Sequence, residues 1–473
     1  MRRWNNFQSW CLNMQISMTK SKSAQASANT MLICCAAVAA LICVAQISGS
    51  TVVIAASLSV FLLFTVWAGI ENRVFPVLLF FLPWSPLMKL YVSGISLYTI
   101  ALLIACGICV VKNKFRLKIY QVVLAAEIMA LTLTAKVLQT NSISNNYLFF
   151  MAMLLLFPCV TKGVEGNISF WHITLFFACG IITAALTAQQ ATGYGNISNY
   201  IIVDSYLTIT RLSGFYGDPN FYSAHVSACL AGVQLLLGYE NSRNRRIILA
   251  IITIMLLYCG LLSASKSFIV VSACQFLVWI PILMEKNDHG GNRIRIFMGI
   301  LCATAIVITS SVFKELIRII DDRFAYAANL SQITTGRTEL WKMYIDKLTH
   351  NGLLAVFGEG YTSVNLNRKA SHNTVIQSIY QFGLVGVPLL AAWVYCELKS
   401  VIDEARVKIK WKYALLMAIG IALPWMALDI LFFDEFFLLP VYGVFGTIYA
   451  SKEAEKMAAS SVQSYEAKNE KPL

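Results

Sequence analysis

Charged side chains are scarce in this sequence of 473 residues: they make up 13% of it, whereas hydrophobic residues make up 58%. A typical soluble domain has about 25% charged residues and about 45–50% apolar residues. Exposure of an excess of apolar surface this large to water is strongly unfavourable. The composition therefore excludes an ordinary globular enzyme, a disordered protein and a nucleic-acid-binding module, and it indicates that lipid surrounds most of the chain.

Three common catalytic signatures are also missing. The sequence has no GxxxxGK[ST] phosphate loop, no HExxH zinc motif and no GxSxG nucleophile motif. Its one Asp-Asp pair, Asp321-Asp322, falls in a predicted amphipathic helix and is typical of a solvated face. We therefore expect chemistry without a metal ion or other cofactor, carried by arginine, lysine and histidine.

The thirteen cysteines do not suggest a disulfide or metal framework. Twelve of them lie in or at the ends of apolar runs, where a cysteine acts as a small hydrophobic residue. The net charge of +13 has a similar explanation, since the basic residues mostly lie between apolar runs. That arrangement is typical of membrane topology, and we expect no nucleic-acid partner.

Long apolar runs recur along the whole chain, and a membrane-spanning helix needs about 17–25 such residues. Fourteen segments fit this pattern: 31–47, 51–70, 74–91, 95–111, 119–138, 147–160, 170–188, 221–238, 247–262, 267–284, 296–313, 373–395, 413–428 and 430–450. The run 147–160 is short and the last pair contains Asp434 and Glu435, so twelve spans are an alternative. The sequence therefore predicts an all-α, polytopic integral membrane protein with about 12–14 transmembrane helices.

The distribution of lysine and arginine sets the predicted orientation. With the N-terminus inside, 25 of the 37 basic residues fall in inner segments, and eight of the other twelve lie in one long outer loop. We therefore expect a multi-pass protein of the inner (cytoplasmic) membrane with both termini in the cytoplasm. The outer side then carries two long segments, 189–220 and 314–372, and loops of that length are usually functional.

These features divide the chain into five parts. They are a cytoplasmic tail (1–30), N-terminal transmembrane helices with an outer loop (31–210), a core that includes the loop 314–372 (211–395), C-terminal transmembrane helices (396–450) and a charged cytoplasmic tail for which we expect disorder (451–473). The loop 314–372 should carry two amphipathic helices over the outer mouth. Their apolar faces are formed by Phe313, Leu316, Ile320 and Phe324, and by Trp341, Tyr344 and Leu348.

Four predicted helix starts on the outer side carry a basic or ionisable side chain, or lie beside one. A cap residue and a proline in the first turn mark such a start at Asp218-Pro219-Asn220, seven residues after Arg211. The other three starts are Lys266 after Ser265, Arg337 after Thr335-Gly336 with Glu339 in the first turn, and His372 after Ser371.

These starts suit a phosphate ligand. A helix N-terminus exposes unpaired N–H groups and a positive dipole end, and arginine adds a fork that matches phosphate oxygens. Convergence of the four starts would make a pocket for a doubly charged phosphate group at the outer interface. Structural alternatives exist: an Arg211–Asp218 pair that braces the loop, a Lys266 that reaches lipid headgroups, a surface charge at Arg337, and a His372 without chemical role.

Five short motifs, in order along residues 211–390, together resemble the O-antigen ligase and O-antigen polymerase family. They are RLSGFYGDPN (211–220), LSASKS (262–267), TGRTELW (335–341), FGEG (357–360), and HN (372–373) followed by Gly383 and Gly386. They are similar to the family's R-x-x-G…(D/N)PN, LSxSR, GRxxxW, GxG and HNxxL…GxxG elements. Lys266 departs from the arginine that is common at its position, so it keeps a point charge but loses the bidentate fork.

The resemblance implies a fold of the lipid-linked-sugar glycosyltransferase type and a glycan donor carried on undecaprenyl pyrophosphate. It implies metal-independent, inverting transfer to a hydroxyl of a glycan, lipid or wall acceptor on the outer face. In this sequence Arg211 and Arg337 would hold the pyrophosphate and stabilise it as it leaves, and His372 would lie near the acceptor hydroxyl as base or orienting group. We expect further substrate contacts from Lys266, Asp218, Asn220, Asn373 and Trp341.

Several functional alternatives stay open. A ligase and a polymerase share the motifs, although the pattern is closest to polymerase-like members of capsule and exopolysaccharide clusters. A polysaccharide or ion transporter would depend more on Glu127, Lys136 and Asp429, but the sequence has no two related halves, which transporters often show. A receptor or assembly scaffold would explain the amphipathic helices but not the basic helix starts. His225, four residues into a span, is typical of a packed polar residue.

Overall fold

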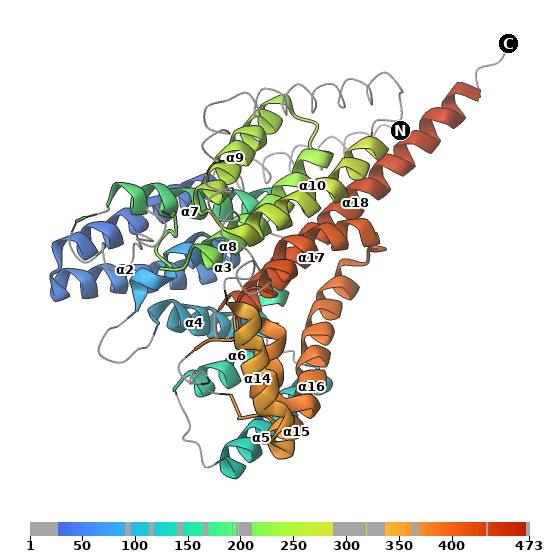
Figure 1. The fold of residues 1–473 in the computed structure, drawn as a ribbon. Coiled ribbons are helices and arrows are strands. Elements are labelled where there is room, and N and C mark those ends of the chain that lie inside the picture. The colour runs from blue at the N-terminus through green and yellow to red at the C-terminus, as the bar shows by residue number, and fades with distance from the viewer. Residues whose placement is uncertain are drawn as a thin grey trace.

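The computed structural model describes residues 27–89, 96–112, 118–139, 145–163, 169–191, 193–194, 197, 211–286, 318, 336–361, 366, 369–431 and 434–469 (Figure 1). Within these ranges the chain is built of helices, and its β-structure is limited to one isolated bridge between Lys89 and Ser96. The predicted span 296–313, the first predicted amphipathic helix and the Asp321-Asp322 pair lie outside the described residues.

The helices follow the apolar runs of the sequence. After a helix over Ser27–Ser48 come α2 (Thr51–Ile70), α3 (Val74–Phe81), the 3₁₀ helix η1 (Leu82–Met88), α4 (Leu97–Lys112), α5 (Ile119–Leu138), α6 (Asn145–Gly163), α7 (Phe170–Gln190), α8 (Pro219–Tyr239), α9 (Arg243–Leu262), α10 (Lys266–Lys286), α14 (Arg337–Thr349), α15 (Gly352–Phe357), α16 (Thr374–Ala405), α17 (Trp411–Trp425) and α18 (Glu435–Asn469).

Eight helices of the described part are long and apolar enough to cross a membrane. They are Ser27–Ser48, α2, α5, α7, α8, α9, the Lys266–Met284 portion of α10, and α16. This confirms an all-α protein of the multi-pass membrane type, whereas the count of 12–14 spans and the orientation stay predictions. Shorter apolar helices occupy the predicted spans 74–91, 95–111, 147–160 and 413–428.

Helix α8 is the centre of the bundle. Nearly all its side chains are buried, whereas only 28% of the apolar stretch of α9 and of α10 is buried. It packs against α7, α9, α10, α17 and α18, so it contacts helices of the N-terminal part, of the core and of the C-terminal region. A helix that is buried all round cannot move without disturbing its neighbours, so its N-terminus is a rigid base for the loop that precedes it.

The C-terminal segment differs from the prediction. Disorder was expected from residue 451, but α18 continues as helix to Asn469 and projects from the bundle (Figure 1). The sequence after Ser451 is rich in alanine, glutamate and lysine, which favour helix, and Lys456 forms an ion pair with Glu453 three residues before it. The prediction of disorder, which rested on the charged composition, was therefore wrong, because the helix propensity of these residues determines the structure here.

Helix α16 has a sharp kink that the sequence pattern did not predict. Gly383 has φ 66° and ψ 178°, a backbone conformation that is essentially restricted to glycine. The kink leaves two carbonyl oxygens of α16 for other donors: Glu359 N–H donates to Tyr380 O at 2.8 Å, and Gly360 N–H donates to Gln381 O at 3.0 Å. The FGEG motif therefore packs backbone to backbone against the kink.

Helix α14 is the second of the two predicted amphipathic helices, and its presence is confirmed. Tyr344 and Leu348 are buried against Leu354 of α15 and Tyr380 of α16. The Tyr344 hydroxyl donates to Lys369 O at 2.8 Å, and burial raises the pKa of Tyr344 to about 12. The helices α14 and α15 are thereby fixed beside the first half of α16 (Figure 1).

Candidate functional site

The segment before α8 is joined to the turn between α9 and α10. Arg211 is 8% exposed, and its Nε donates to Ser263 O at 2.9 Å, while Leu212 N–H donates to Leu262 O at 3.0 Å. The guanidinium group is therefore held at the turn that leads into α10. The first residue of α10 is Lys266, which is half-buried, so the predicted helix start at this lysine is confirmed.

Asp218 and Asn220 extend the same contact. Asp218 is the N-cap of α8, and its Oδ1 accepts from both the backbone N–H of Asn220 at 2.8 Å and the Asn220 Nδ2 at 2.9 Å. The Asn220 Oδ1 then accepts from Ser265 Oγ at 2.8 Å. We call the set Arg211, Asp218, Asn220, Ser263 and Ser265 the Arg211 cluster. It joins the motifs RLSGFYGDPN and LSASKS, and its helix cap was predicted from sequence.

A second set of contacts forms around the turn that precedes α16. The Asp429 carboxylate accepts three hydrogen bonds: from Ser371 Oγ at 2.6 Å and Asn373 N–H at 3.0 Å on Oδ1, and from His372 N–H at 3.0 Å on Oδ2. His372 is half-buried and has φ 50°, which is uncommon for a residue other than glycine. Asp429 therefore holds this histidine in a turn that its own backbone does not favour.

The helix that was predicted to start at His372 starts two residues later, at Thr374. The N-cap of α16 is Asn373, whose Oδ1 accepts from Val375 N–H at 3.0 Å and Ile376 N–H at 3.1 Å. Asparagine is among the best N-cap residues because its side chain can satisfy these orphan donors. Asn373 is 4% exposed, so in this structure its side chain caps the helix and contributes to the site by fixing the turn.

Helix α14 contacts this turn through Trp341. Its start at Arg337 is confirmed, with Gly336 as N-cap at φ 77°. Trp341 Nε1 donates to Ser371 O at 3.0 Å. Residues four apart share one face of a helix, so Arg337 and Trp341 are neighbours on the side of α14 that faces the His372 turn. We call Trp341, Ser371, His372, Asn373 and Asp429 the His372 cluster.

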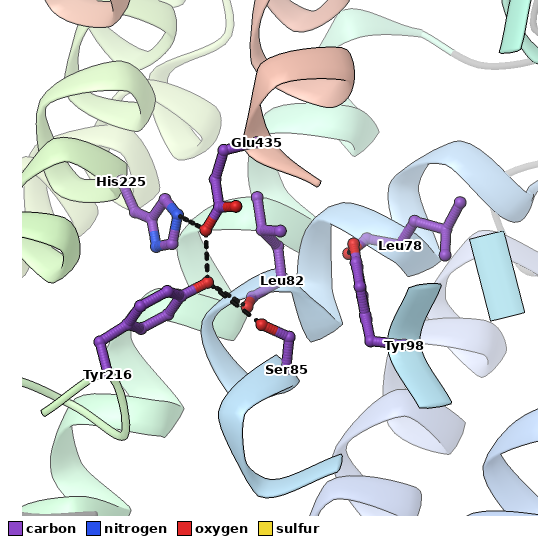
Figure 2. A network of polar contacts seen from close by, with 7 residues as sticks. All are labelled: Leu78, Leu82, Ser85, Tyr98, Tyr216, His225 and Glu435. Atoms are coloured by element: carbon purple, nitrogen blue, oxygen red, sulfur yellow. Dashed lines mark hydrogen bonds and ion pairs between the residues drawn. The ribbon is translucent and has the colours of Figure 1, made fainter. Parts of the chain in front are cut away.

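A buried polar network connects the Arg211 segment to the start of α18 (Figure 2). The Glu435 Oε1 accepts from the Tyr216 hydroxyl at 2.6 Å and from His225 Nε2 at 3.0 Å, and both His225 and Glu435 are at most 2% exposed. The Tyr216 hydroxyl also lies 2.9 Å from Leu82 O and 3.2 Å from Ser85 Oγ. Burial, with the Glu435 carboxylate as the second cause, raises the pKa of Tyr216.

The sequence reasoning missed the roles of three residues in these networks. Asp429 was considered only for a transporter, Glu435 only as an interruption of an apolar run, and Tyr216 only as part of a motif. The one available signal was that charges inside apolar runs are costly and usually functional or paired. His225 was expected to be a packed polar residue, and its burial against Glu435, Tyr216 and Phe177 confirms this.

The remaining candidates for an ion path do not form one group. Glu127 lies on the exposed face of α5, so it does not pack against a neighbouring helix. Lys136 of the same helix is 2% exposed, beside Gly360 of the FGEG motif. Within the described ranges, no three His, Cys, Asp or Glu side chains lie close enough together to hold a metal ion.

The contacts therefore place the predicted site residues in two clusters. Arg211, Asp218 and Asn220 are joined to the turn that carries Lys266, and Trp341 is joined to the turn of His372 and Asn373. Convergence of Arg211 with Arg337 and His372 on one phosphate group stays a prediction from the sequence. A scan of the chain against protein-family models gives no match, and a search of curated proteins gives none either.

Proposed function

We propose that this protein is a membrane glycosyltransferase that moves a glycan from undecaprenyl pyrophosphate to an acceptor hydroxyl on the outer face of the inner membrane. One observation carries the proposal: the five motifs are distant in sequence but contact one another in pairs. The first motif contacts the second through Ser263 and Ser265, the third contacts Ser371, next to the fifth, through Trp341, and the fourth contacts the fifth at Gly383.

The chemistry requires a cationic site for the leaving group. As the bond between the anomeric carbon and the pyrophosphate oxygen breaks, negative charge develops on that oxygen. Fixed cations in a site that excludes water stabilise this charge before it forms, and removal of one such donor typically costs a factor of about 10²–10³ in rate. In our proposal Arg211 and Arg337 supply this stabilisation, and Lys266 adds a third positive charge at the start of α10.

The acceptor must lose a proton as it attacks. In the proposed reaction its hydroxyl oxygen forms the new bond to the anomeric carbon from the face opposite the pyrophosphate, so the sugar is inverted. The His372 imidazole accepts the hydroxyl proton or orients the hydroxyl, as a neutral imidazole can near pH 7. Undecaprenyl pyrophosphate leaves with the electron pair. The hydrogen bonds from the His372 turn to Asp429 support this role, because general-base catalysis needs a fixed geometry.

Reconstitution in lipid vesicles with an undecaprenyl-pyrophosphate repeat unit tests the proposal. A ladder of products without added acceptor identifies a polymerase, whereas a single transfer to an added acceptor identifies a ligase. We expect Arg211→Ala, Arg337→Ala and His372→Ala each to lower the transfer rate by about 10²-fold or more while the protein stays in the membrane. Lys342→Ala removes an exposed charge from α14 and serves as the matched control.

Two results would contradict the proposal. The first is a product of normal length and normal rate from all three variants, since the cationic site would then be dispensable. The second is glycan flux across sealed vesicles that survives the loss of Arg211, Arg337 and His372 without any new glycosidic bond. That second result would favour the transporter alternative.

A further inference from the structure

The segment 211–218 is held by the first residue of the last helix. Glu435 begins α18, more than 200 residues after this segment, and its Oε1 accepts from the Tyr216 hydroxyl (Figure 2). The same oxygen accepts from His225 Nε2 of α8. Hydrogen bonds to a charged acceptor are about twice as strong as neutral ones, and burial prevents water from replacing them.

Tyr216 is the part of the segment that this carboxylate can hold most firmly. Its ring is stacked on Phe221 at 6.0 Å between centroids and meets the edge of the His225 ring at 4.9 Å. The preceding residue, Phe215, is buried against Trp84 of η1. Gly214 and Gly217 flank the two aromatic residues and both have positive φ, so the chain turns sharply on each side of them. The aromatic pair is thus an anchor inside a segment that glycine makes bendable.

Because of the two flanking glycines, the position of the segment that carries Arg211 depends on the aromatic anchor. Apart from the hydrogen bond to Glu435, the stretch between Arg211 and the Asp218 cap is held by the contact of Phe215 with Trp84, by the Tyr216 hydroxyl against Leu82 O and Ser85 Oγ, and by backbone contacts such as Leu212 N–H to Leu262 O. Glycine-rich chain has more conformations to lose than any other, so it needs external contacts to adopt one. The carboxylate of Glu435 supplies the strongest of these contacts.

From this geometry we propose that Glu435 is a positioning residue for the Arg211 side of the site. It acts through Tyr216 and does not touch the substrate. Asp429 does the same for the His372 turn, and the two carboxylates are six residues apart in sequence. Six residues span at most about 20 Å even when fully extended, so the two anchors lie within that distance of each other. The part of this inference that concerns donor binding rests on the proposed function.

The positioning role makes a prediction about chemistry at residue 435. Both donors, Tyr216 and His225, reach the same oxygen of Glu435, and the amide oxygen of a glutamine can accept from both. Glu435→Gln should therefore retain the position of the segment, whereas Glu435→Ala should release it. A role in proton transfer or ion transport would need the carboxylate itself, and then Glu435→Gln would be as damaging as Glu435→Ala.

The experiment measures two quantities on purified protein in detergent or vesicles: amide hydrogen exchange of peptides covering 211–218, and the KM values for lipid-linked donor and for acceptor. In Glu435→Ala we expect exchange of 211–218 to be about tenfold to a hundredfold faster and the donor KM to rise about tenfold or more. The acceptor KM should not change, because Asp429 still holds the His372 turn. Glu435→Gln should resemble the unchanged protein in all three measurements.

Two further variants keep the test decisive. Asp434→Ala removes the neighbouring carboxylate, whose Oδ2 accepts from Thr99 of α4, and it should leave exchange of 211–218 unchanged. Tyr216→Phe removes the same hydrogen bond from the other side, together with the contacts of the hydroxyl to Leu82 O and Ser85 Oγ, and it replaces Glu435→Ala if that variant does not fold. It should speed exchange of 211–218 at least as much.

The outcomes separate this inference from the proposed function. Unchanged exchange and unchanged donor KM in Glu435→Ala would overturn the inference, as would equal damage from Glu435→Gln or equal loosening by Asp434→Ala. An unchanged protein that transfers no glycan, but shows the expected exchange pattern in the variants, would overturn the proposed function and leave the positioning of 211–218 by Glu435 intact.

Discussion

Replacement of Asp429 by asparagine should release the His372 turn while the side-chain volume stays the same. The aspartate accepts three hydrogen bonds, two on Oδ1 and one on Oδ2, and two of the donors are backbone N–H groups. An asparagine offers only one oxygen, and its NH₂ group must face a donor on the other side. With that oxygen in the place of Oδ1, the His372 N–H loses its acceptor. In the place of Oδ2, Ser371 Oγ and Asn373 N–H keep only their bonds within the turn, from Ser371 Oγ to Asn373 O at 3.0 Å and from Asn373 N–H to Ser371 Oγ at 3.2 Å.

The magnitude follows from these contacts. A buried donor without an acceptor costs about 1–3 kcal/mol, and each remaining bond falls from a charged to a neutral acceptor at a further cost of about 1 kcal/mol. The left-handed backbone of His372 costs a residue with a Cβ about 1–2 kcal/mol and favours opening of the turn in both proteins, so it does not add to the difference between them. We expect the turn to be weakened by about 2–4 kcal/mol, which is roughly a 30-fold to several-hundredfold change in its population.

Amide hydrogen exchange of peptides covering 369–376 measures this directly, and the glycan transfer rate measures its consequence. Exchange should speed up by this factor, and the transfer rate should fall in proportion to the loss of the closed turn if His372 works only from it. Asp346→Asn, on the exposed face of α14, is the control for loss of one negative charge. Exchange in Asp429→Asn at the rate of the unchanged protein would refute the argument that this carboxylate holds the turn.

Three further experiments test separate parts of the structure. Gly383→Ala should lower the thermal midpoint in detergent and the yield, because its Cβ would lie 2.2 Å from a backbone oxygen. Gly352→Ala is the control, since its Cβ meets nothing within 4 Å, and equal melting of both variants would contradict the kink. Lys266→Arg should keep the donor KM and Lys266→Ala should raise it about tenfold, and equal values in all three proteins would exclude a phosphate contact. Asn220→Ala and Ser265→Ala should each slow transfer severalfold, and a double-mutant cycle should show strong non-additivity, since fully additive effects would mean that their hydrogen bond is irrelevant.

Features that depend on neighbouring residues could be predicted from the sequence. The expected spans 51–70 and 119–138 coincide with α2 and α5, because an apolar run sets both the position and the ends of such a helix. The Asp218 cap was predictable for a similar reason, since a cap interacts with N–H groups two or three residues away. Helix starts at Lys266 and Arg337 were correct on the same basis.

Features that depend on distant residues could not be predicted in this way. The turn at His372 is fixed by a carboxylate 57 residues further along the chain, and Tyr216 is fixed by one that is 219 residues away. No local pattern specifies such partners, because they are selected by how the helices pack. The kink at Gly383 was hidden for a related reason: the apolar run 373–395 is continuous, and only contact with the FGEG segment explains a glycine that leaves helical geometry.

Asp429 and Glu435, two carboxylates that lie in or beside apolar segments, make irregular backbone possible at the site. A turn next to membrane-embedded helices exposes N–H groups that lipid cannot satisfy, and each unsatisfied group costs several kcal/mol. Asp429 accepts from two backbone N–H groups at the His372 turn, and Glu435 accepts from the aromatic anchor of a glycine-flanked turn. An apolar residue at position 429 would leave the His372 N–H without this acceptor, and one at position 435 would leave the Tyr216 hydroxyl with only Leu82 O and Ser85 Oγ as partners. A neutral amide could accept only from donors that share one oxygen. Asp429 serves donors on both of its oxygens, whereas Glu435 serves donors on one, so asparagine should fail at position 429 where glutamine succeeds at 435.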